Sequence, residues 1–223
     1  MKSENSLVTL HQRTEYEYFP KWRSVYKKEK RISFAISLIE KGAGLVLDAG
    51  CRWGDVTNEI HKNNVNVIGV DFVPKFIDMA KKLHKDINFY VGDLLNLKFE
   101  DNTFDVVFIG EVIEHIPNQN KAIQEAYRVL KPKGKLILTT PNIASLRCRI
   151  KLLLGKQIDT DEVHFKLLTK KELVNLLERN NFKIELIKGD GIKISKIRLP
   201  CFYQNFADIF IVKATKKNRK LLQ

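Results

Sequence analysis

The sequence predicts an α/β domain built on a doubly wound, mainly parallel sheet, and two observations support this prediction. Short β-rich runs alternate with helical patterns from residue 44 onward, which is typical of βαβ units. The chain has 223 residues, about one and a half times a usual domain, and no internal repeat or linker divides it. We therefore expect one elaborated domain with a sizeable core.

The residues before the first strand, 1–41, are predicted to form a helical cap over this core. Aromatic side chains stand among charges, and an apolar pattern of helical spacing follows, with Tyr16, Tyr18, Phe19, Trp22, Tyr26, Ile32, Phe34, Ala35 and Ile39. Tyr18, Trp22 and Tyr26 either close one side of a ligand site or take part in ordinary helix packing.

Seven short runs are predicted as strands of the sheet. They are rich in β-branched and aromatic residues, and they cover residues 45–48, 65–70, 87–91, 105–109, 135–140, 182–186 and 208–214. Successive strands are separated by helical segments in the first part of the chain, so the connections there are crossovers between parallel strands.

Helix signals fill the intervals between these strands. Pro74 stands at the first turn of one helix, and an apolar stripe over residues 122–130 marks another. Pro132, in the sequence LKPKG, ends that second helix and turns the chain into the next strand. Thr169 and Glu172 have the spacing of a capping box, which predicts the start of a third helix.

The composition is that of a globular protein. Hydrophobic residues make up 44% and charged residues 29% of the chain, which argues against collagen-like, disordered and membrane-embedded classes. Residues 1–14 hold no apolar signal segment, and no run of about 18 apolar residues occurs. Cys51, Cys148 and Cys201 are too far apart for a disulfide framework or a zinc knuckle. These features predict a soluble, cytoplasmic protein.

The chain is strongly basic. Lys and Arg number 39 against 26 acidic residues, so the net charge is +13. Such an excess suits nucleic acid, an anionic membrane surface or simple solubility. Most lysines stand singly on polar helix faces, which favours a solvated surface. The charge by itself therefore names no partner.

The segment VLDAGCRWGD, Val46 to Asp55, carries the sharpest functional signal. A buried strand ends in an acid, Asp48, and a turn with Gly50 leads to a helix that begins near Gly54. Glycines let the backbone approach a nucleotide-like ligand, and the free N–H groups of a helix start can bind it. The spacing departs from the G-x-G-x-x-G loop of dinucleotide sites, and no Gly-Lys-Ser/Thr follows as in a P-loop.

This segment resembles the first motif of the class I S-adenosylmethionine (SAM)-dependent methyltransferases, acid-x-Gly-x-Gly-x-Gly. Asp48, Gly50 and Gly54 match the motif, and Arg52 replaces the middle glycine. A positive φ at Arg52 would cost roughly 1–2 kcal/mol. The resemblance implies SAM as cofactor, a contact from the loop residue Cys51, and a Rossmann-like methyltransferase fold whose seven-stranded sheet ends in an antiparallel pairing.

Two more acids follow at the ends of the next two strands. Asp71 lies 23 residues after Asp48, near the roughly 20 expected between a nucleotide loop and a ribose-binding acid. Phe72 stands beside it as a further cofactor contact. The resemblance implies that Asp93 accepts the adenine amino hydrogens and that Leu94 adds an apolar contact to the ring. Acids at three successive strand ends are expected to share one rim of the sheet.

The acceptor chemistry is expected at the end of the fourth strand. Methyl transfer from a sulfonium is an in-line displacement, so the enzyme mainly aligns the acceptor and manages its proton. Gly110 and Glu111 fall beside the expected methyl position, and Glu111 and His115 are the candidate catalytic residues. In a helix these two would share a face, and histidine titrates near neutrality. His115 is equally compatible with a capping or packing role.

The same segment, with TPN at residues 140–142, resembles the branch that contains ubiquinone-type O-methyltransferases and small-RNA 3′-end 2′-O-methyltransferases. In both groups a Glu-x-x-Glu-His element is associated with a divalent ion. Glu111, Glu114 and His115 reproduce that spacing, and His164 is a candidate fourth ligand for Mg²⁺ or Mn²⁺. Because many methyltransferases with a similar segment use no metal, no metal site is predicted here.

The resemblance also divides the chain into regions. Residues 42–142 form the expected SAM-binding core, residues 143–170 an acceptor-site lid, residues 171–217 the rest of the same domain, and residues 218–223 a tail. The lid contains ASLRCRIKLLLGK, which mixes leucines with basic residues in an amphipathic pattern. Such a helix covers an apolar acceptor, lies on an anionic membrane, contacts a phosphate backbone or packs plainly on the domain.

The function that the sequence indicates best is SAM-dependent methyl transfer to an oxygen of a small or lipid-like molecule. An RNA methyltransferase is the second interpretation, favoured by the net charge of +13 but without a recognisable RNA module. A non-catalytic SAM-binding or partner-binding module is the third. The oligomeric state does not follow from the sequence.

Overall fold

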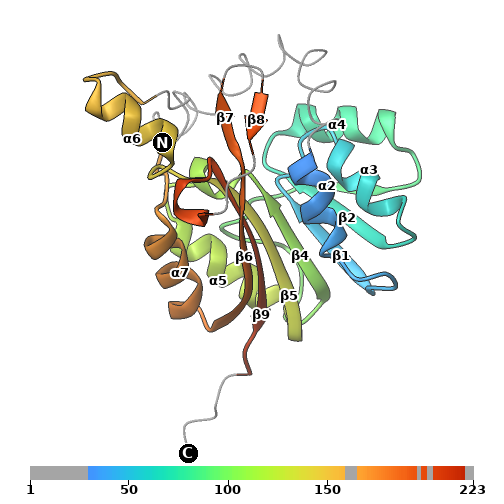
Figure 1. The fold of residues 1–223 in the computed structure, drawn as a ribbon. Helices are drawn as coiled ribbons and strands as arrows, with labels where there is room; N and C mark the ends of the chain where they lie inside the picture. Colours follow the sequence, from blue (N-terminus) through green and yellow to red (C-terminus); the bar gives the residue numbers. More distant parts are fainter. Residues whose placement is uncertain (1–29, 159–164, 195–196, 200–202, 219–223) are drawn as a thin grey trace, which may run out of the picture.

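A seven-stranded sheet runs through the computed structural model, which describes residues 30–158, 165–194, 197–199 and 203–218 (Figure 1). In chain order its strands are β1 (Leu45–Ala49), β2 (Asn66–Asp71), β3 (Asn88–Val91), β4 (Phe104–Gly110), β5 (Leu130–Pro141), β6 (Phe182–Asp190) and β9 (Ile209–Lys216). They are arranged in the order β3-β2-β1-β4-β5-β9-β6. The predicted α/β class and the seven predicted strands are confirmed.

The sheet is mixed, with a parallel part and an antiparallel end. β3, β2, β1, β4 and β5 pair in parallel, whereas β9 pairs antiparallel with both β5 and β6. This confirms the antiparallel pairing that the resemblance implies. The strand order switches at β1, which has β2 on one side and β4 on the other, and ligands of open α/β sheets bind outside the carboxyl ends of strands at such a point.

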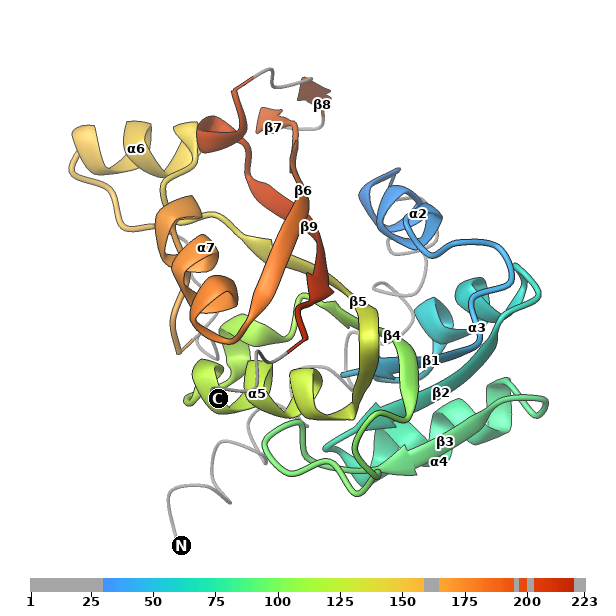
Figure 2. The ribbon, with the colours of Figure 1, turned by 90° about the horizontal axis from the view of Figure 1, so that it is seen from below.

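Helices cover both faces of the sheet. In chain order they are α2 (Lys30–Ser37), α3 (Asp55–His61), α4 (Pro74–Leu83), η1 (Ile113–His115), α5 (Gln119–Val129), α6 (Leu146–Leu153), α7 (Lys170–Arg179) and η2 (Gln204–Phe206). Apolar side chains of α2, α3 and α4 pack in one core cluster, and those of α5 and α7 pack in a second one. Viewed from below, α2 and α3 lie on one side of the sheet and α5 and α7 on the other (Figure 2). The sheet is therefore doubly wound.

The predicted helix starts are confirmed by their caps. Pro74 occupies the first turn of α4, where its missing N–H costs nothing. Thr169 and Glu172 form both bonds of the capping box at the start of α7. The Asn118 side chain accepts the Lys121 N–H at 3.0 Å and caps α5, a signal that sequence reasoning missed.

Two local predictions were incomplete. The LKPKG segment ends α5 as predicted, but it belongs to β5: the pairing with β4 shifts from Phe104↔Leu130 to Val106↔Lys135. The extra residues of this bulge accommodate Pro132, which has no N–H for the ladder. The hairpin of β7 (Ile192–Ile194) and β8 (Ile197–Leu199) was not predicted, because each strand has only three residues.

The N-terminal cap is described only in part. α2 buries Ile32, Ala35 and Ile36 against the sheet, as the apolar pattern predicted for this stretch. Tyr18, Trp22 and Tyr26 lie outside the described residues, so their expected role stays a prediction. Within the described part of the chain, no helix is both long enough and apolar enough to cross a membrane.

Candidate active site

The loop after β1 is hydrogen-bonded to the end of β2. The N–H groups of Gly50 and Cys51 both donate to the carbonyl of Val70, at 2.7 and 3.0 Å, and the Gly54 N–H donates to the Cys51 carbonyl at 2.8 Å. α3 then begins at Asp55, as predicted. These bonds fix the loop at the carboxyl edge of the sheet, beside the point where the strand order switches.

Both glycines of this loop are required by their surroundings. Gly50 and Gly54 have φ angles of +89° and +82°, a region that L side chains rarely adopt. A Cβ at Gly50 would lie 2.3 Å from Cγ2 of Val112, and a Cβ at Gly54 would lie 2.6 Å from Cζ of Phe89. The two glycines therefore allow the loop to pack directly on the chain beneath it.

Replacing Gly54 with alanine is expected to lower the free energy of unfolding by roughly 2–3 kcal/mol, because the positive φ and the contact with Phe89 both oppose a Cβ. Gly42→Ala is the matched control, since Gly42 has a φ of +77° and nothing within 4 Å of an added Cβ. Urea unfolding of both variants separates two contributions to the lost free energy of unfolding, the steric contact with Phe89 and the strain of the positive φ. An equal loss in the two variants would contradict the proposed packing of Gly54.

Arg52, at the middle position of the loop, has a positive φ, a conformation that favours glycine. Its φ is +49°, which costs a non-glycine residue roughly 1–2 kcal/mol. The Arg52 N–H donates to Oδ2 of Asp71 at 2.8 Å. A hydrogen bond to a charged group is worth about 1.5–3 kcal/mol, enough to offset the strain. Arg52 is therefore accommodated at this position with its backbone bound to Asp71.

Asp71 lies where the loops after β1 and β3 meet. Its Oδ1 accepts the Val73 N–H at 2.9 Å, its Oδ2 accepts the Arg52 N–H, and its backbone carbonyl accepts the Gly92 N–H at 3.0 Å. The chemistry and the fixed position of this carboxylate fit a vicinal diol such as a ribose.

Asp48 lies beneath the loop instead of on the rim. It is 2% exposed, and Oγ1 of Thr57 donates to its Oδ2 at 2.6 Å. Burial raises the pKa of Asp48 to about 7, while the Thr57 hydrogen bond opposes that rise. Asp48 thus ties the end of β1 to α3. All three acids stand at or just after the carboxyl ends of their strands, as expected, and Asp48 is the most deeply buried of them.

The side chains that follow β2 and β3 differ in how much of their surface is exposed. Phe72 is 54% exposed at the end of β2, a large apolar surface open to the edge. Asp93 is half-buried and accepts the Leu95 N–H at 2.8 Å. Leu94 is 7% exposed and belongs to the core, so little of its side chain faces the edge. A ring placed here meets Phe72 more readily than Leu94.

The end of β4 does not have the geometry that was expected for the acceptor side. Glu111 has a φ of +55° and precedes η1, so Glu111 and His115 do not lie in one helix, and the condition under which they would share a face is not met. The Glu111 carboxylate lies 3.1 Å from the guanidinium of Arg31 on α2. Gly110 pairs with Thr139 in β5 and precedes Glu111 at this edge. His115 is half-buried at the end of η1.

Glu114, which lies between Glu111 and His115 in the sequence, has a buried side chain. It is 1% exposed, and Oγ1 of Thr140 donates to its Oε2 at 3.2 Å. Burial raises the pKa of Glu114 to about 8; hydrogen bonds oppose the rise and the neighbouring Glu111 charge adds to it. Glu114 is therefore largely a neutral acid at pH 7.

These residues do not fit a divalent ion. The Glu111 carboxylate is bound to a guanidinium, and a neutral Glu114 is a poor ligand for a hard cation. In the part of the chain that the structure describes, no group of three or more His, Cys, Asp or Glu side chains is placed to hold a metal. His164 lies outside that part.

Sequence reasoning missed two residues of this edge. Val112 covers Gly50, and Arg31 binds Glu111 across 80 positions of the chain. The positive φ of Gly50 could be anticipated from the motif, but nothing local in the sequence indicates its partner. Contacts of this separation depend on how α2 packs on the sheet.

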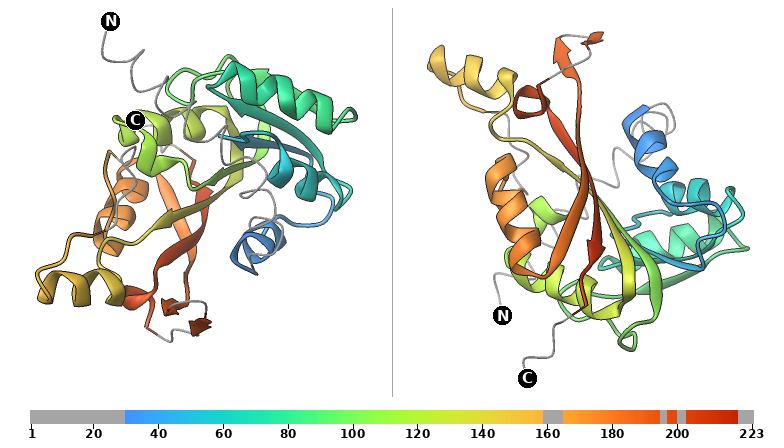
Figure 3. Two further views of the ribbon diagram at one scale, coloured as in Figure 1. Left: turned by 90° about the horizontal axis from the view of Figure 1, so that it is seen from above. Right: turned by 60° about the horizontal axis from the view of Figure 1, so that its bottom comes forward.

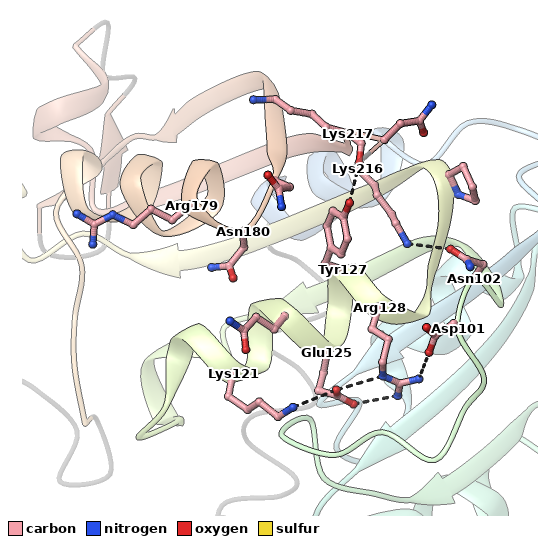
Figure 4. Close-up of a pocket in the computed structure, with 14 residues that line it drawn as sticks. Asp101, Asn102, Lys121, Glu125, Tyr127, Arg128, Arg179, Asn180, Lys216 and Lys217 are labelled. Carbon is pink, nitrogen blue, oxygen red and sulfur yellow. Dashed lines mark hydrogen bonds and ion pairs between the residues drawn. The ribbon is translucent and has the colours of Figure 1, made fainter. Parts of the chain in front are cut away.

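A cavity of about 700 Å³ lies at the opposite edge of the sheet, lined by residues just before β4, on α5, at the start of β5, at the end of α7 and at the end of β9 (Figure 4). Several of its charged side chains are engaged: Arg128 lies 2.8 Å from Asp101 and 2.9 Å from Glu125, and the ammonium of Lys216 lies over the Tyr127 ring. This network fastens α5 to the ends of the sheet. It is remote from the loops at the carboxyl edge.

Comparison with known sequences agrees with this architecture. A family described as a methyltransferase domain matches residues 47–138. The chain is 30% identical over 199 residues to a demethylmenaquinone methyltransferase from Lactobacillus johnsonii, and the match covers 74% of this chain and 75% of that protein. It is 31% identical to the mitochondrial ubiquinone biosynthesis O-methyltransferase of Rattus norvegicus over 65% of this chain, and spans 46% of that longer protein.

Solved structures share the fold. A SAM-dependent methyltransferase from Thermotoga maritima superposes with a TM-score of 0.71 at 19% identity, covering 92% of this chain and 97% of that one. A second, from Methanosarcina mazei, gives a TM-score of 0.64 at 21% identity, covering 82% of this chain and 96% of that one. With the sequence relatives, these matches confirm the predicted SAM-dependent enzyme. The chain belongs to the class I S-adenosylmethionine-dependent methyltransferases.

Proposed function

We propose that SAM binds at the carboxyl edge of β1, β2 and β3 and that its methyl group passes to an oxygen of a small, lipid-like acceptor. The position of Asp71 is the observation on which this proposal rests. Its carboxylate is held by Arg52 and Val73, and hydrogen bonds join the loops after β1 and β3 to the end of β2 around it. These bonds fix its orientation before any ligand arrives.

Each residue of the edge has a proposed role toward the cofactor. Asp71 accepts the two ribose hydroxyls, Phe72 contacts the adenine ring with its exposed face, and Asp93 accepts the adenine amino hydrogens. Gly50, Cys51, Gly54, Asp48, Leu94 and Gly110 remain proposed cofactor-site residues, with Asp48 and Leu94 acting from beneath the surface.

His115 is the proposed group that manages the acceptor proton. Bound SAM supplies an electrophilic methyl group on a sulfonium. An acceptor hydroxyl must lose its proton as the new bond forms, histidine is the side chain that most often serves as a general base, and His115 stands at the end of η1. The Glu111 carboxylate is engaged by Arg31, so we assign it to positioning α2 against the site instead of to proton transfer.

The acceptor class rests on the names of the relatives. The relatives named above are a demethylmenaquinone methyltransferase and a ubiquinone biosynthesis O-methyltransferase, and a Rickettsia prowazekii relative is named a ubiquinone/menaquinone biosynthesis C-methyltransferase. These names support a quinol-like acceptor and leave two target atoms, oxygen and carbon.

Incubation with SAM labelled in the methyl group and a panel of prenylated catechols and demethylated quinols tests this proposal. We expect a labelled O-methyl product, identified by mass spectrometry and by the chemical shift of the new methyl group. His115→Ala should lower turnover while leaving S-adenosylhomocysteine affinity unchanged. A C-methyl product would contradict the proposed atom, and transfer to none of these acceptors by a cofactor-bound protein would contradict the acceptor class.

RNA is a second candidate acceptor, favoured by the net charge of +13. Several of the basic groups are already paired within the chain, such as Arg128 with Glu125 and Lys131 with Asp105. Filter binding of RNA across a salt series separates the two acceptors, because phosphate contacts must weaken steeply with salt.

We also propose a cytoplasmic location, which agrees with the free, buried thiols of Cys51 and Cys148.

A further inference from the structure

The ion pair of Arg31 with Glu111 joins two distant segments at the carboxyl edge of the sheet. Arg31 lies in the first turn of α2, and Glu111 directly follows β4. One guanidinium nitrogen, Nη2, lies 3.1 Å from Oε1 and 3.3 Å from Oε2 of Glu111. The two side chains are only 11% and 15% exposed, so water and salt screen this pair weakly.

α2 is also held on the sheet at other points. It buries three apolar side chains in a core cluster, and Nζ of Lys188 lies 3.8 Å from the centre of the Phe34 ring. Glu40, just after the helix, lies 3.0 Å from Lys213 on β9. Figure 3 shows α2, the blue helix, on the side of the sheet that also carries α3 and α4. These contacts should keep α2 in place when the charge of Arg31 is removed.

A carboxylate at the position of Glu111 affects the reaction, if the cofactor binds as proposed with its sulfur directed toward the end of β4. Methyl transfer turns the sulfonium cation into a neutral thioether. A negative charge beside the sulfonium therefore stabilises the bound cofactor more than the transition state. Such a charge strengthens SAM binding and slows the transfer, unless a positive group next to Glu111 balances it.

The groups around Glu111 supply this positive charge as guanidinium and not as a metal ion. Both oxygens of Glu111 are within 3.3 Å of Arg31, so a metal ion would have to displace a bonded cation. Glu114, the next acid in the sequence, is 1% exposed and is a poor ligand for an ion from solvent. Burial raises its pKa, the Glu111 charge adds to the rise, and the charge of Arg52 opposes it. Arg52 therefore brings a second guanidinium to this edge.

We infer that the Arg31 guanidinium takes the place of a divalent cation at this edge and that, by neutralising Glu111 beside the sulfonium, Arg31 is a positioning residue for methyl transfer. An arginine suits this role because it stays charged at every physiological pH and its donors match a carboxylate. The inference rests on the proposed position of the cofactor but not on the identity of the acceptor.

The ratio of the affinities for SAM and S-adenosylhomocysteine tests this role, because the two ligands differ in the charge on sulfur. Calorimetry without an acceptor measures both affinities. Arg31→Met should shift the ratio toward SAM by roughly tenfold, since the Glu111 carboxylate then acts on the sulfonium unbalanced. Arg31→Lys keeps the positive charge, and Arg31→Met combined with Glu111→Gln removes both charges, so each should keep the original ratio. Lys62→Met, which breaks an exposed ion pair with Glu59 on α3, is the matched control and should keep it too.

An unchanged ratio in Arg31→Met would overturn the inference. Equal losses of affinity for the two ligands would overturn it as well, because a merely structural role weakens both alike. Thermal unfolding verifies the fold of each variant, and Arg31→Gln replaces Arg31→Met if the latter is unstable.

Titration with Mn²⁺, followed by electron paramagnetic resonance, gives a readout that needs neither cofactor nor acceptor. We expect no stoichiometric Mn²⁺ site in the unmodified protein. A site that Glu111→Gln abolishes would overturn the inference. Failure of the proposed function is distinguishable: it shows as S-adenosylhomocysteine affinity that is unaltered in Asp71→Ala, or as transfer to none of the acceptors, and neither result depends on Arg31.

Discussion

Replacing Asp71 with alanine should weaken S-adenosylhomocysteine binding by about a hundredfold or more. The reason is that two hydrogen bonds from the ribose hydroxyls to a buried carboxylate are lost, and each such charge-assisted bond is worth about 1.5–3 kcal/mol. Isothermal titration calorimetry measures the loss directly. S-adenosylhomocysteine is the appropriate ligand because it lacks the reactive methyl group and does not turn over.

A control is needed because Asp71 also holds the chain. Its carboxylate accepts the N–H groups of Arg52 and Val73, so its removal loosens the loop as well. Asp71→Asn retains one carbonyl acceptor and should bind with intermediate affinity. Asp78→Ala, on the exposed side of α4, should leave both affinity and stability unchanged. Unaltered affinity in Asp71→Ala would contradict the proposed ribose contact.

Replacing Glu114 with glutamine should make the protein more stable at about pH 8, on the order of 4 kcal/mol, and change little at about pH 5. The pKa of Glu114 is about 8 in the folded chain, against an ordinary value of 4.5. The folded state therefore binds the proton more tightly than the unfolded state does. The stability that this proton provides is present below the ordinary pKa and is lost as the pH rises through the folded pKa.

Urea unfolding across this pH range measures the effect. Glutamine resembles the protonated acid, and its carbonyl oxygen can still accept from Thr140. Glu178→Gln, at an exposed position of α7, is the matched control and should leave the pH profile unchanged. The stability of the Glu114→Gln variant should still fall somewhat as the pH rises, because the pKa of Asp48 is raised to about 7. This fall should be smaller than that of the unmodified chain. A profile identical to that of the unmodified chain would contradict the burial argument.

The fold was largely predictable because its signals are local. Strand runs of β-branched residues, the proline at the start of α4 and the capping box of α7 each act within a few positions of the chain. The hairpin of β7 and β8 was missed because strands of three residues carry almost no periodicity. The extension of β5 through Pro132 was missed because a bulge is defined by the partner strand, which the local sequence does not reveal.

The site was predictable only in outline. Motif spacing placed the loop of Gly50 and Gly54 and the acid Asp71 at one edge of the sheet, and the structure has them there. Whether an acid faces that edge or the interior depends on the packing of the following helix, so the burial of Asp48 against Thr57 could not be anticipated.

The state of the two glutamates after β4 could not be predicted from the sequence for a similar reason. The ion pair of Arg31 with Glu111 and the burial of Glu114 depend on segments far away in the sequence. The spacing of Glu111, Glu114 and His115 resembles a metal-binding element, but in the folded chain Glu111 pairs with Arg31 and Glu114 is buried. Residue types at a fixed spacing constrain a site only when the backbone between them is also known.

A crystal structure of this chain with S-adenosylhomocysteine would test the central claim most directly. We expect the ribose hydroxyls on the carboxylate of Asp71, the adenine between Phe72 and Asp93, and the sulfur directed toward the end of β4. Density for the ligand elsewhere, for example in the cavity beside Arg128 and Lys216 at the opposite edge, would contradict the account.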